Sequence, residues 1–498
     1  MQSIVQDTVA SAAREDHALV KSFLQKLGAP YYDTESGRHV NSTPILDITD
    51  EVARFVGGSK PNGNRFYLKL EYKNQLTESV KGRAVASMVL NAIRDGAIYN
   101  KSGTKKRWIE PTSGNTGKGL AEIADLLGVE FTAVFSRLDV SEEIKEHLTK
   151  FRAKILTIGS EYRLDDLEAL AQKHHKTVVY YWSNFGGAND DIQLLFSGKV
   201  AAERKQRSLN AILGQIDGNF LLDGLLPLSL EASETPMISR VQKGEFDKLK
   251  NDLLIRIPEL GNPNKIVAFV CAIGNTSMLL STLLNQLGFT NVCSIQGGVK
   301  ALRSAEANEA RSSEFCPLPG ASIAKSSIEF VKKLVGDNPE EYFTFMQYEN
   351  VENVYAHAST TGPELLEQTR NLDYVVCTFG SGGTATGLAQ YFADKKSRVI
   401  VAFPDRPVEG IRTLSGADGL AFYKPELYEQ VIKTSTAGLE AVLEYFAKRG
   451  LGFGPSTAIA LLAAIEESRE QKSKTYAVIA ADGIENYASE YGHILGPR

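Results

Sequence analysis

Residues 110–117 combine residue types that bind small anions. The segment reads Glu-Pro-Thr-Ser-Gly-Asn-Thr-Gly, and it lies between a short apolar strand and a helix predicted from apolar residues at i, i+3, i+4 and i+7. Backbone N–H groups at a helix start have no partner within the helix and attract negative charge. The candidate side-chain ligands are Thr112, Ser113, Asn115 and Thr116. A carboxylate is the expected guest, although a capped turn without a ligand would have the same pattern.

A second anion-binding pattern follows the apolar strand 373–379. It consists of Gly380, Ser381, Gly382, Gly383 and Thr384. Glycines let the backbone approach a phosphate closely and surround it with N–H groups. The glycine spacing and the lack of a lysine distinguish the segment from a Walker loop and from a dinucleotide-binding fingerprint. A glycine turn without a ligand is the alternative.

Lys81 stands at the predicted start of another helix, whose apolar face runs from Val85 to Ile93. The start of a helix is the unfavourable end for a cation. A lysine there is either solvated or required in its neutral form as a nucleophile. Position alone favours the solvated lysine.

Taken together, the lysine, the carboxylate-type segment and the phosphate-type segment suggest a phosphorylated aldehyde cofactor. Pyridoxal 5'-phosphate needs a lysine for its Schiff base, a phosphate cup and a group that faces the ring nitrogen. A hydroxyl group such as that of Ser456 would leave this nitrogen largely neutral. A neutral ring suits β-elimination and β-replacement better than transamination.

On these residues the chain resembles fold-type II pyridoxal phosphate enzymes of the cysteine synthase/cystathionine β-synthase family. The resemblance covers residues 42–158 and 317–490. The shared motifs are 79–81, 112–117, 347–350, 360–364, 380–384, 409–411 and Ser456. The resemblance implies an α/β fold with two open, twisted α/β subdomains. The alternation of strands and helices agrees with it, including an expected strand at 342–346 and a helix starting at Thr360.

The resemblance also implies a role for each matched residue. Lys81 would form the Schiff base and later act as general base. Thr112, Ser113, Asn115, Thr116 and Gln347 would hold the substrate carboxylate, with Asn115 also near the ring hydroxyl. Gly380 to Thr384 would hold the phosphate, Gly410 would line the mouth of the site, and Ser456 would face the ring nitrogen. Gly82 stands where the family usually has Asp, and residues 74–75 and 481–484 also depart from its pattern, so the substrate stays open.

The segment between the two halves resembles a rhodanese domain. Its strand 265–270 is followed by Cys271, a tight loop, a helix, a strand and Gly297-Gly298. A loop of inward-pointing N–H groups would stabilise a thiolate and its persulfide at Cys271. The basic residue usual after this cysteine is absent, so a buried cysteine in a regulatory fold is the alternative. We expect domains at 1–158, 159–316 (the insert, clearest over 218–310) and 317–498.

Composition narrows the class of protein. The chain has 498 residues, a net charge of −5 and four cysteines without metal-type spacing, so no metal site is expected. No apolar run is long enough for a membrane span, and the negative charge gives no reason to expect nucleic acid. No signal peptide is recognised at the N-terminus, and a cytoplasmic protein is expected. The family resemblance implies a homodimer.

The expected activity is cysteine synthase-like β-replacement on an activated serine, with sulfur as nucleophile and possible delivery of that sulfur as a persulfide on Cys271. The partners would then be a small amino-acid substrate and a sulfur donor. One alternative is β-elimination from a cysteine-type substrate, with the insert as sulfur acceptor. Another is β-replacement by a non-sulfur nucleophile, with a regulatory insert.

Overall fold

A computed structural model describes most of the chain outside its middle third. It describes residues 2–58, 61–136, 140–157, 327–406, 408 and 410–495, together with 161–162, 167, 170–172, 175–182, 214–215, 250–251, 253–255, 257–270, 277, 281, 284–285 and 289–295. The chain divides into two compact units. Unit 1 comprises residues 1–131, 141–153 and 345–498, and unit 2 comprises 132–140 and 154–344. The division expected from the sequence, with an insert at 159–316, stays a prediction.

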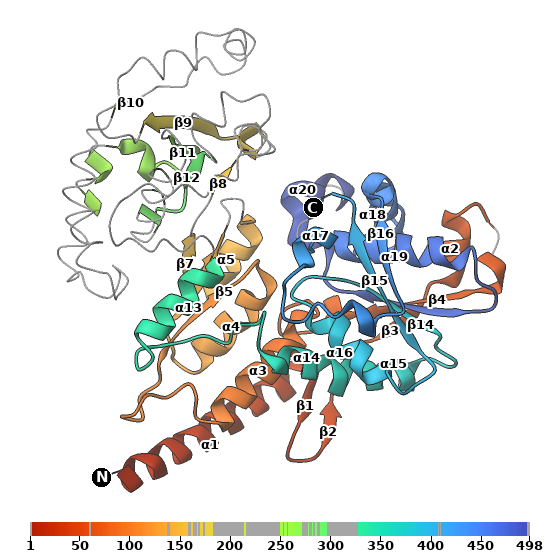
Figure 1. The fold of residues 1–498 in the computed structure, drawn as a ribbon, viewed down its shortest axis with the longest axis horizontal. Coiled ribbons are helices and arrows are strands. Elements are labelled where there is room, and N and C mark those ends of the chain that lie inside the picture. The colour runs from red at the N-terminus through yellow and green to blue at the C-terminus, as the bar shows by residue number, and fades with distance from the viewer. Residues whose placement is uncertain are drawn as a thin grey trace. The chain divides into compact units, whose positions relative to one another are not determined.

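A six-stranded sheet forms the centre of unit 1 (Figure 1). Its order is β16 (Gln430–Thr434), β15 (Arg398–Pro404), β14 (Tyr374–Thr378), β17 (Thr475–Ala480), β4 (Arg65–Leu70) and β3 (Ile45–Asp47). Neighbouring strands are parallel except for β3, which pairs antiparallel with β4. Parallel strands need covering on both faces, which explains why the central strands are apolar at nearly every position.

Helices cover both faces of this sheet. Alternate residues of a strand point to opposite faces, so Val376 joins one core and its neighbours Val375 and Cys377 join the other. The first core is completed by α2 (Thr49–Phe55), α18 (Leu439–Ala447) and α19 (Pro455–Ser468). The second is completed by α15 (Gly362–Gln368) and α16 (Gly383–Phe392).

The strand order reverses between β14 and β17, and this point locates the site. From β14 the chain moves outward to β15 and β16, whereas β17 returns to the other side of β14. Ligands of open α/β sheets bind outside the carboxyl ends of the strands at such a point. The glycine segment 380–384 follows the carboxyl end of β14, and Ala481 and Asp482 follow that of β17.

The remaining elements of unit 1 carry the other motifs. The helix α3 (Lys81–Arg94) begins at Lys81, and α4 (Asn115–Leu126) begins within the 110–117 segment, after β5 (Arg107–Pro111). Both starts agree with the sequence prediction. The other helices and strands are α1 (Gln2–Leu27), β1 (Tyr31–Asp33), β2 (Arg38–Val40), α5 (Glu142–Lys150), α14 (Val351–Ala356), α17 (Leu414–Ala417) and α20 (Ala488–Leu495).

Two predicted elements differ from the structure. The strand expected at 342–346 is shorter, because only β13 (Tyr342–Phe343) pairs. The helix expected to start at Thr360 begins earlier, as α14, and reaches α15 through a π-helical turn at His357–Thr361. Pro363 suggested a helix start because proline favours the first turn. The true start is capped by Asn350, whose side chain accepts the Glu352 N–H at 3.0 Å.

Unit 2 contains a second parallel sheet. Its order is β10 (Gly214–Gln215), β9 (Thr177–Trp182), β11 (Lys265–Val270), β12 (Val292–Ile295) and β8 (Glu161–Tyr162). All four neighbouring pairs are parallel. Unit 2 also holds β7 (Lys154–Thr157), α13 (Ser327–Asp337) and, apart from its first residue, β6 (Phe131–Phe135), which pairs parallel with β7. The strands expected at 178–182, 265–270 and 292–295 are therefore confirmed.

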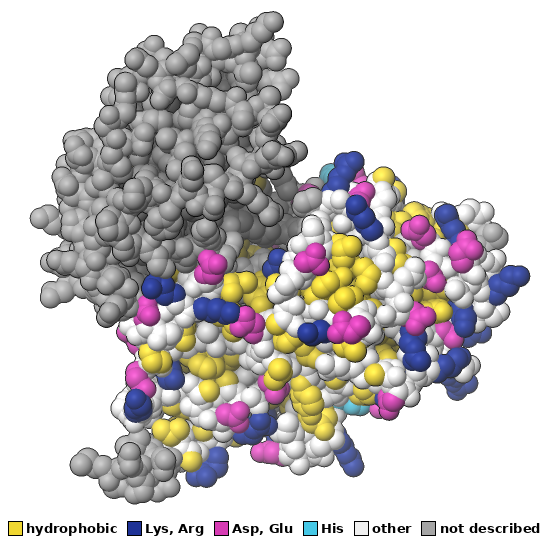
Figure 2. All heavy atoms as spheres, viewed as in Figure 1, with side chains coloured by type: hydrophobic (Ala, Val, Ile, Leu, Met, Phe, Trp, Pro, Cys, Tyr) yellow, Lys and Arg dark blue, Asp and Glu magenta, His cyan; other side chains and the backbone are white. Residues whose placement is uncertain are grey.

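The distribution of charged side chains on the surface agrees with the small net charge of −5 (Figure 2). Figure 2 shows Lys and Arg side chains interspersed with Asp and Glu over the described part of the viewed face. Within the described ranges, none of the helices is both long and apolar enough to cross a bilayer.

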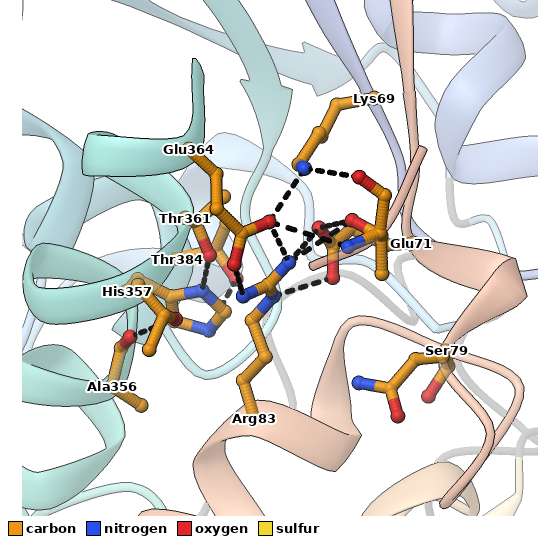
Figure 3. Close-up of polar contacts among 12 residues, drawn as sticks. Lys69, Glu71, Ser79, Arg83, Ala356, His357, Thr361, Glu364 and Thr384 are labelled. Carbon is orange, nitrogen blue, oxygen red and sulfur yellow. Dashed lines mark hydrogen bonds and ion pairs between the residues drawn. The ribbon is translucent and has the colours of Figure 1, made fainter. Parts of the chain in front are cut away.

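A buried cluster of four charges joins distant segments of unit 1 (Figure 3). The Arg83 guanidinium donates to both carboxylate oxygens of Glu71 at 2.8 and 2.9 Å and to both of Glu364 at 2.6 and 2.7 Å. Lys69 adds a 2.6 Å ion pair with Glu364. All four side chains are at most 1% exposed, so two positive and two negative charges balance away from water. The cluster fixes the first turn of α3, two residues after Lys81.

We predict that Arg83→Met destabilises unit 1 by about 3–5 kcal/mol, because it leaves two carboxylates buried with a single lysine between them. The measurement is chemical denaturation of the full chain followed by circular dichroism. Arg94→Met, on the same helix but with a side chain 48% exposed, is the control. It should change the free energy of unfolding by less than about 0.5 kcal/mol. Equal effects of the two substitutions would contradict the prediction.

Candidate active site

One cavity of unit 1 brings the predicted segments together. Nine of the predicted residues line it: Lys81, Ser113, Asn115, Thr116, Gly380, Gly382, Thr384, Gly410 and Ser456. Four more predicted residues lie next to this lining. Ser381 and Gly383 belong to the glycine segment, and Thr112 and Gln347 form hydrogen bonds within or to the 110–117 segment. Cys271 lies outside the described residues, so its place is not part of the site geometry.

Lys81 reaches across the cavity to the glycine segment. Its Nζ lies 3.4 Å from the Ser381 Oγ, although the two residues are 300 positions apart in the chain. Burial lowers the pKa of Lys81 to about 8, with the charge of Arg412 adding to the shift and that of Asp482 opposing it. A sizeable fraction of the amine is therefore neutral near pH 8. Lys81 is therefore a buried amine of lowered pKa, not a solvated surface charge.

The 110–117 segment is shaped by Thr112 and by glycine. The Thr112 hydroxyl accepts the N–H groups of Gly114 and Gly117, each at 3.1 Å. It therefore closes the turn, while Ser113, Asn115 and Thr116 line the cavity. Gly114 has a φ of 149°, and a Cβ there would lie 2.5 Å from Ile144. Only glycine fits this position.

Glu110 and Gln347 hold the segment from behind. The buried Glu110 carboxylate accepts the backbone N–H groups of Phe345, Met346 and Gln347, each at 2.9 Å. The Gln347 side chain accepts from the Thr116 hydroxyl at 2.7 Å and donates to the Pro111 carbonyl at 3.1 Å. Sequence reasoning named Gln347 but missed this role of Glu110, since the bonds join residues more than 230 positions apart.

The glycine segment is packed so closely that side chains are excluded from two of its positions. Gly382 has a φ of 94° and precedes the first turn of α16. A Cβ on Gly383 would lie 2.0 Å from the Asn353 side chain. Asn353 in turn donates to the Ser381 hydroxyl at 2.9 Å and to the Gln347 carbonyl at 2.7 Å. The N–H groups at the start of α16 thus face a cavity that suits a phosphate.

Ser456 and Asn115 each have a buried polar atom without a hydrogen-bond partner among the described residues. The Ser456 Oγ is buried in the first turn of α19 and has no hydrogen-bond partner among the described residues. The Asn115 Oδ1 is likewise buried without one in that part of the chain. Buried polar groups normally have partners, so these two atoms fit a ligand with polar atoms of its own.

Asp482 is a site residue that the sequence reasoning named only as a departure from the family pattern. Its Oδ2 accepts from the Asn115 side chain at 3.0 Å and from the Tyr487 hydroxyl at 2.7 Å. It orients Asn115 and places a negative charge near Lys81. Its position after β17, at the carboxyl end of a central strand, was the available signal.

The described cysteines are not candidates for nucleophiles. Cys293 and Cys377 are free and buried. Burial raises the pKa of Cys377 to about 12 and raises that of Cys293 as well. Both thiols therefore stay protonated at neutral pH, as is usual for cysteines buried in a packed core.

Comparison with known proteins gives the family to which this chain belongs. The family model described as pyridoxal-phosphate dependent enzyme matches residues 39–214 and 253–482, and the chain belongs to this family. The cofactor is therefore pyridoxal 5'-phosphate.

Three relatives are cysteine synthases by name. The chain is similar to that of Buchnera aphidicola, with 31% identity over 33% of this chain and 60% of the relative. It is 27% identical to that of Staphylococcus aureus strain Mu50, over 51% of this chain and 81% of the relative. Cysteine synthase A of Escherichia coli K12 is 28% identical over 34% and 60%. The match thus spans less than two thirds of two of these relatives.

The residues of the cavity fit this cofactor. The Lys81 amine, with its lowered pKa, matches the aldehyde of the cofactor. The start of α16, enclosed by glycines, matches the phosphate. The buried Ser456 hydroxyl, which has no partner among the described residues, matches the ring nitrogen.

We predict that cofactor attachment to the cofactor-free protein speeds up with pH only as far as the pKa of Lys81. The neutral amine attacks the aldehyde, so the rate should rise about tenfold per pH unit below pH 8 and level off above it. The measurement is the visible absorbance of the lysine-linked cofactor against time. Lys81→Ala should abolish it, whereas replacing the exposed Lys73 should not. A rate that keeps rising past pH 10 would contradict the lowered pKa.

Proposed function

We propose that this protein catalyses β-replacement on an activated serine, with a sulfur nucleophile, as a cysteine synthase does. One observation carries the proposal: a single cavity joins a nucleophilic lysine, a carboxylate-type segment, a phosphate-type segment and a free serine hydroxyl. The names of the relatives support the same reaction. The positions of the individual residues support the roles given below.

The chain's own residues bind and orient the amino acid. Ser113, Asn115 and Thr116 hold its carboxylate at the start of α4, where the helix dipole favours negative charge. When bound, pyridoxal phosphate withdraws electrons from Cα of the amino acid and makes its proton acidic. The Lys81 amine would take this proton, and its lowered pKa matches a general base at neutral pH.

Ser456 favours the loss of a β-substituent over transamination. A hydroxyl group can share a hydrogen bond with a neutral ring nitrogen, whereas a carboxylate would keep that nitrogen protonated. The buried Ser456 Oγ has no other described partner for this bond. A leaving group on Cβ then departs, and a sulfur nucleophile takes its place.

Unit 2 is proposed to supply the sulfur from Cys271. Its sheet reverses order between β9 and β11, and Cys271 comes directly after Val270, the last residue of β11. The carboxyl end of a central strand at such a reversal is where parallel sheets bind ligands. The five-stranded parallel sheet supports the rhodanese-like interpretation of this region.

The transfer balances with thiosulfate as donor and a small thiol as reductant. The Cys271 thiolate attacks the outer sulfur, forms a persulfide and expels sulfite. The thiol then attacks the Cys271 sulfur, forms a mixed disulfide and releases hydrosulfide as the nucleophile. A second thiol reduces the disulfide and restores the Cys271 thiolate.

We predict cysteine formation when the loaded protein is given an O-activated serine and sulfide. Lys81→Ala should lower the rate by at least about a thousandfold, since it removes both nucleophile and base. The measurement is cysteine released per enzyme. Release of pyruvate and ammonia from cysteine, without synthesis, would instead establish the β-elimination alternative and overturn the proposal.

A separate prediction concerns the sulfur source. With thiosulfate and a thiol in place of sulfide, Cys271→Ser should abolish cysteine formation, while the rate with free sulfide stays unchanged. Cys293→Ala, a buried cysteine of the same unit, is the matched control and should affect neither rate. If Cys271→Ser leaves the thiosulfate-dependent rate intact, the persulfide step is wrong and the β-replacement reaction stands.

A further inference from the structure

His357 is a buried histidine at the start of the π-helical turn, next to the proposed phosphate segment, and no role assigned above uses it. Its side chain is 1% exposed. The Nδ1 lies 3.0 Å from the Thr361 Oγ1, and the Nε2 lies 3.2 Å from the Thr384 Oγ1 (Figure 3). Thr384 itself lines the cavity. The histidine therefore connects the turn to a residue of the site.

The packing of α16 makes this contact close. A Cβ on Gly387 would lie 2.3 Å from the Val354 carbonyl and 2.9 Å from the His357 Cβ. Gly387 lies one turn after Thr384, so its missing side chain brings the first turn of α16 down onto His357. A π-turn inside a helix is unusual and is frequently found at functional sites.

The imidazole is neutral in this position. The pKa of His357 is lowered to about 3, chiefly by burial and also by the positive charge of Arg83, while the charge of Glu71 opposes the shift. A neutral imidazole has one N–H donor and one acceptor nitrogen. Which of the two nitrogens carries the hydrogen depends on whether the Thr384 hydroxyl donates or accepts.

We propose that His357 is a positioning residue that aims the Thr384 hydroxyl at the cofactor phosphate through an oriented chain of hydrogen bonds. Thr361 O–H donates to Nδ1, Nε2–H donates to the Thr384 Oγ1, and Thr384 O–H donates to a phosphate oxygen. A phosphate dianion only accepts, so the Thr384 hydrogen must point to it and its oxygen is left to accept from Nε2. This proposal rests on the assignment of Gly380–Thr384 to the phosphate.

The test compares the affinity for pyridoxal phosphate with that for pyridoxal, which lacks the phosphate, in the Lys81→Ala background. His357→Leu, which removes the Nε2 donor, should weaken pyridoxal phosphate about tenfold and leave pyridoxal unchanged. His357→Gln, whose amide N–H can still donate, should restore part of the loss. Ser359→Ala is the control, because that hydroxyl lies on the same turn but donates to the Tyr355 carbonyl.

Two further measurements separate the possible failures. Thr384→Val should weaken pyridoxal phosphate at least as much as His357→Leu does. If it has no effect, the phosphate assignment itself is wrong; if only His357→Leu has none, the positioning role alone fails. Should His357→Leu not fold, nitrogen NMR of the wild-type protein decides the matter. Among seven histidines, the signal lost in His357→Gln must show a protonated Nε2 and no titration between pH 6 and 8. A protonated Nδ1 would overturn the proposal.

Discussion

The rest of unit 1 depends on the salt bridges of Arg83. This guanidinium binds Glu71, which follows β4, and Glu364, which lies 281 residues after Arg83 in the chain. Charges removed from water cost several kcal/mol each, so the cluster is stable only when every member is in place. The cluster therefore links two parts of the fold: α3, which begins at Lys81, is held in position only when α15 has packed against it.

The same condition explains why the site is assembled from the two ends of the chain. The lysine and the carboxylate-type segment precede unit 2, whereas the glycine segment and Ser456 follow it. The lysine and the glycine segment meet because β4, β14 and β17 are neighbours in one parallel sheet and end at one edge. The carboxylate-type segment follows β5, a strand of a different sheet, and its Asn115 side chain joins this edge by donating to Asp482 after β17. The close approaches at Gly114, Gly383 and Gly387 then set the distances. A long segment can separate the two halves without disturbing the cavity, since the sheet of unit 1 brings the strand ends together.

Local pattern was enough to predict the parts of this site that a few neighbouring residues determine. The start of α3 at Lys81 and the glycine segment after β14 follow from spacing, and both were predicted. Bonds such as those from Glu110 to the backbone at 345–347, or from Asn353 to Ser381, leave no local trace and were missed. The π-turn was missed because Gly362-Pro363 has the pattern of a helix start. The role of Cys271 rests on its position after β11 and stays a prediction.

The central claim is that Lys81 is the residue that carries the cofactor. It is tested most directly by reducing the loaded protein with borohydride, digesting it and locating the pyridoxyl phosphate label by mass spectrometry. Lys118 is the competing site, since it is also buried and burial lowers its pKa as well. The account predicts one labelled peptide, with the added mass on Lys81. A label on Lys118, or one spread over surface lysines, would contradict it.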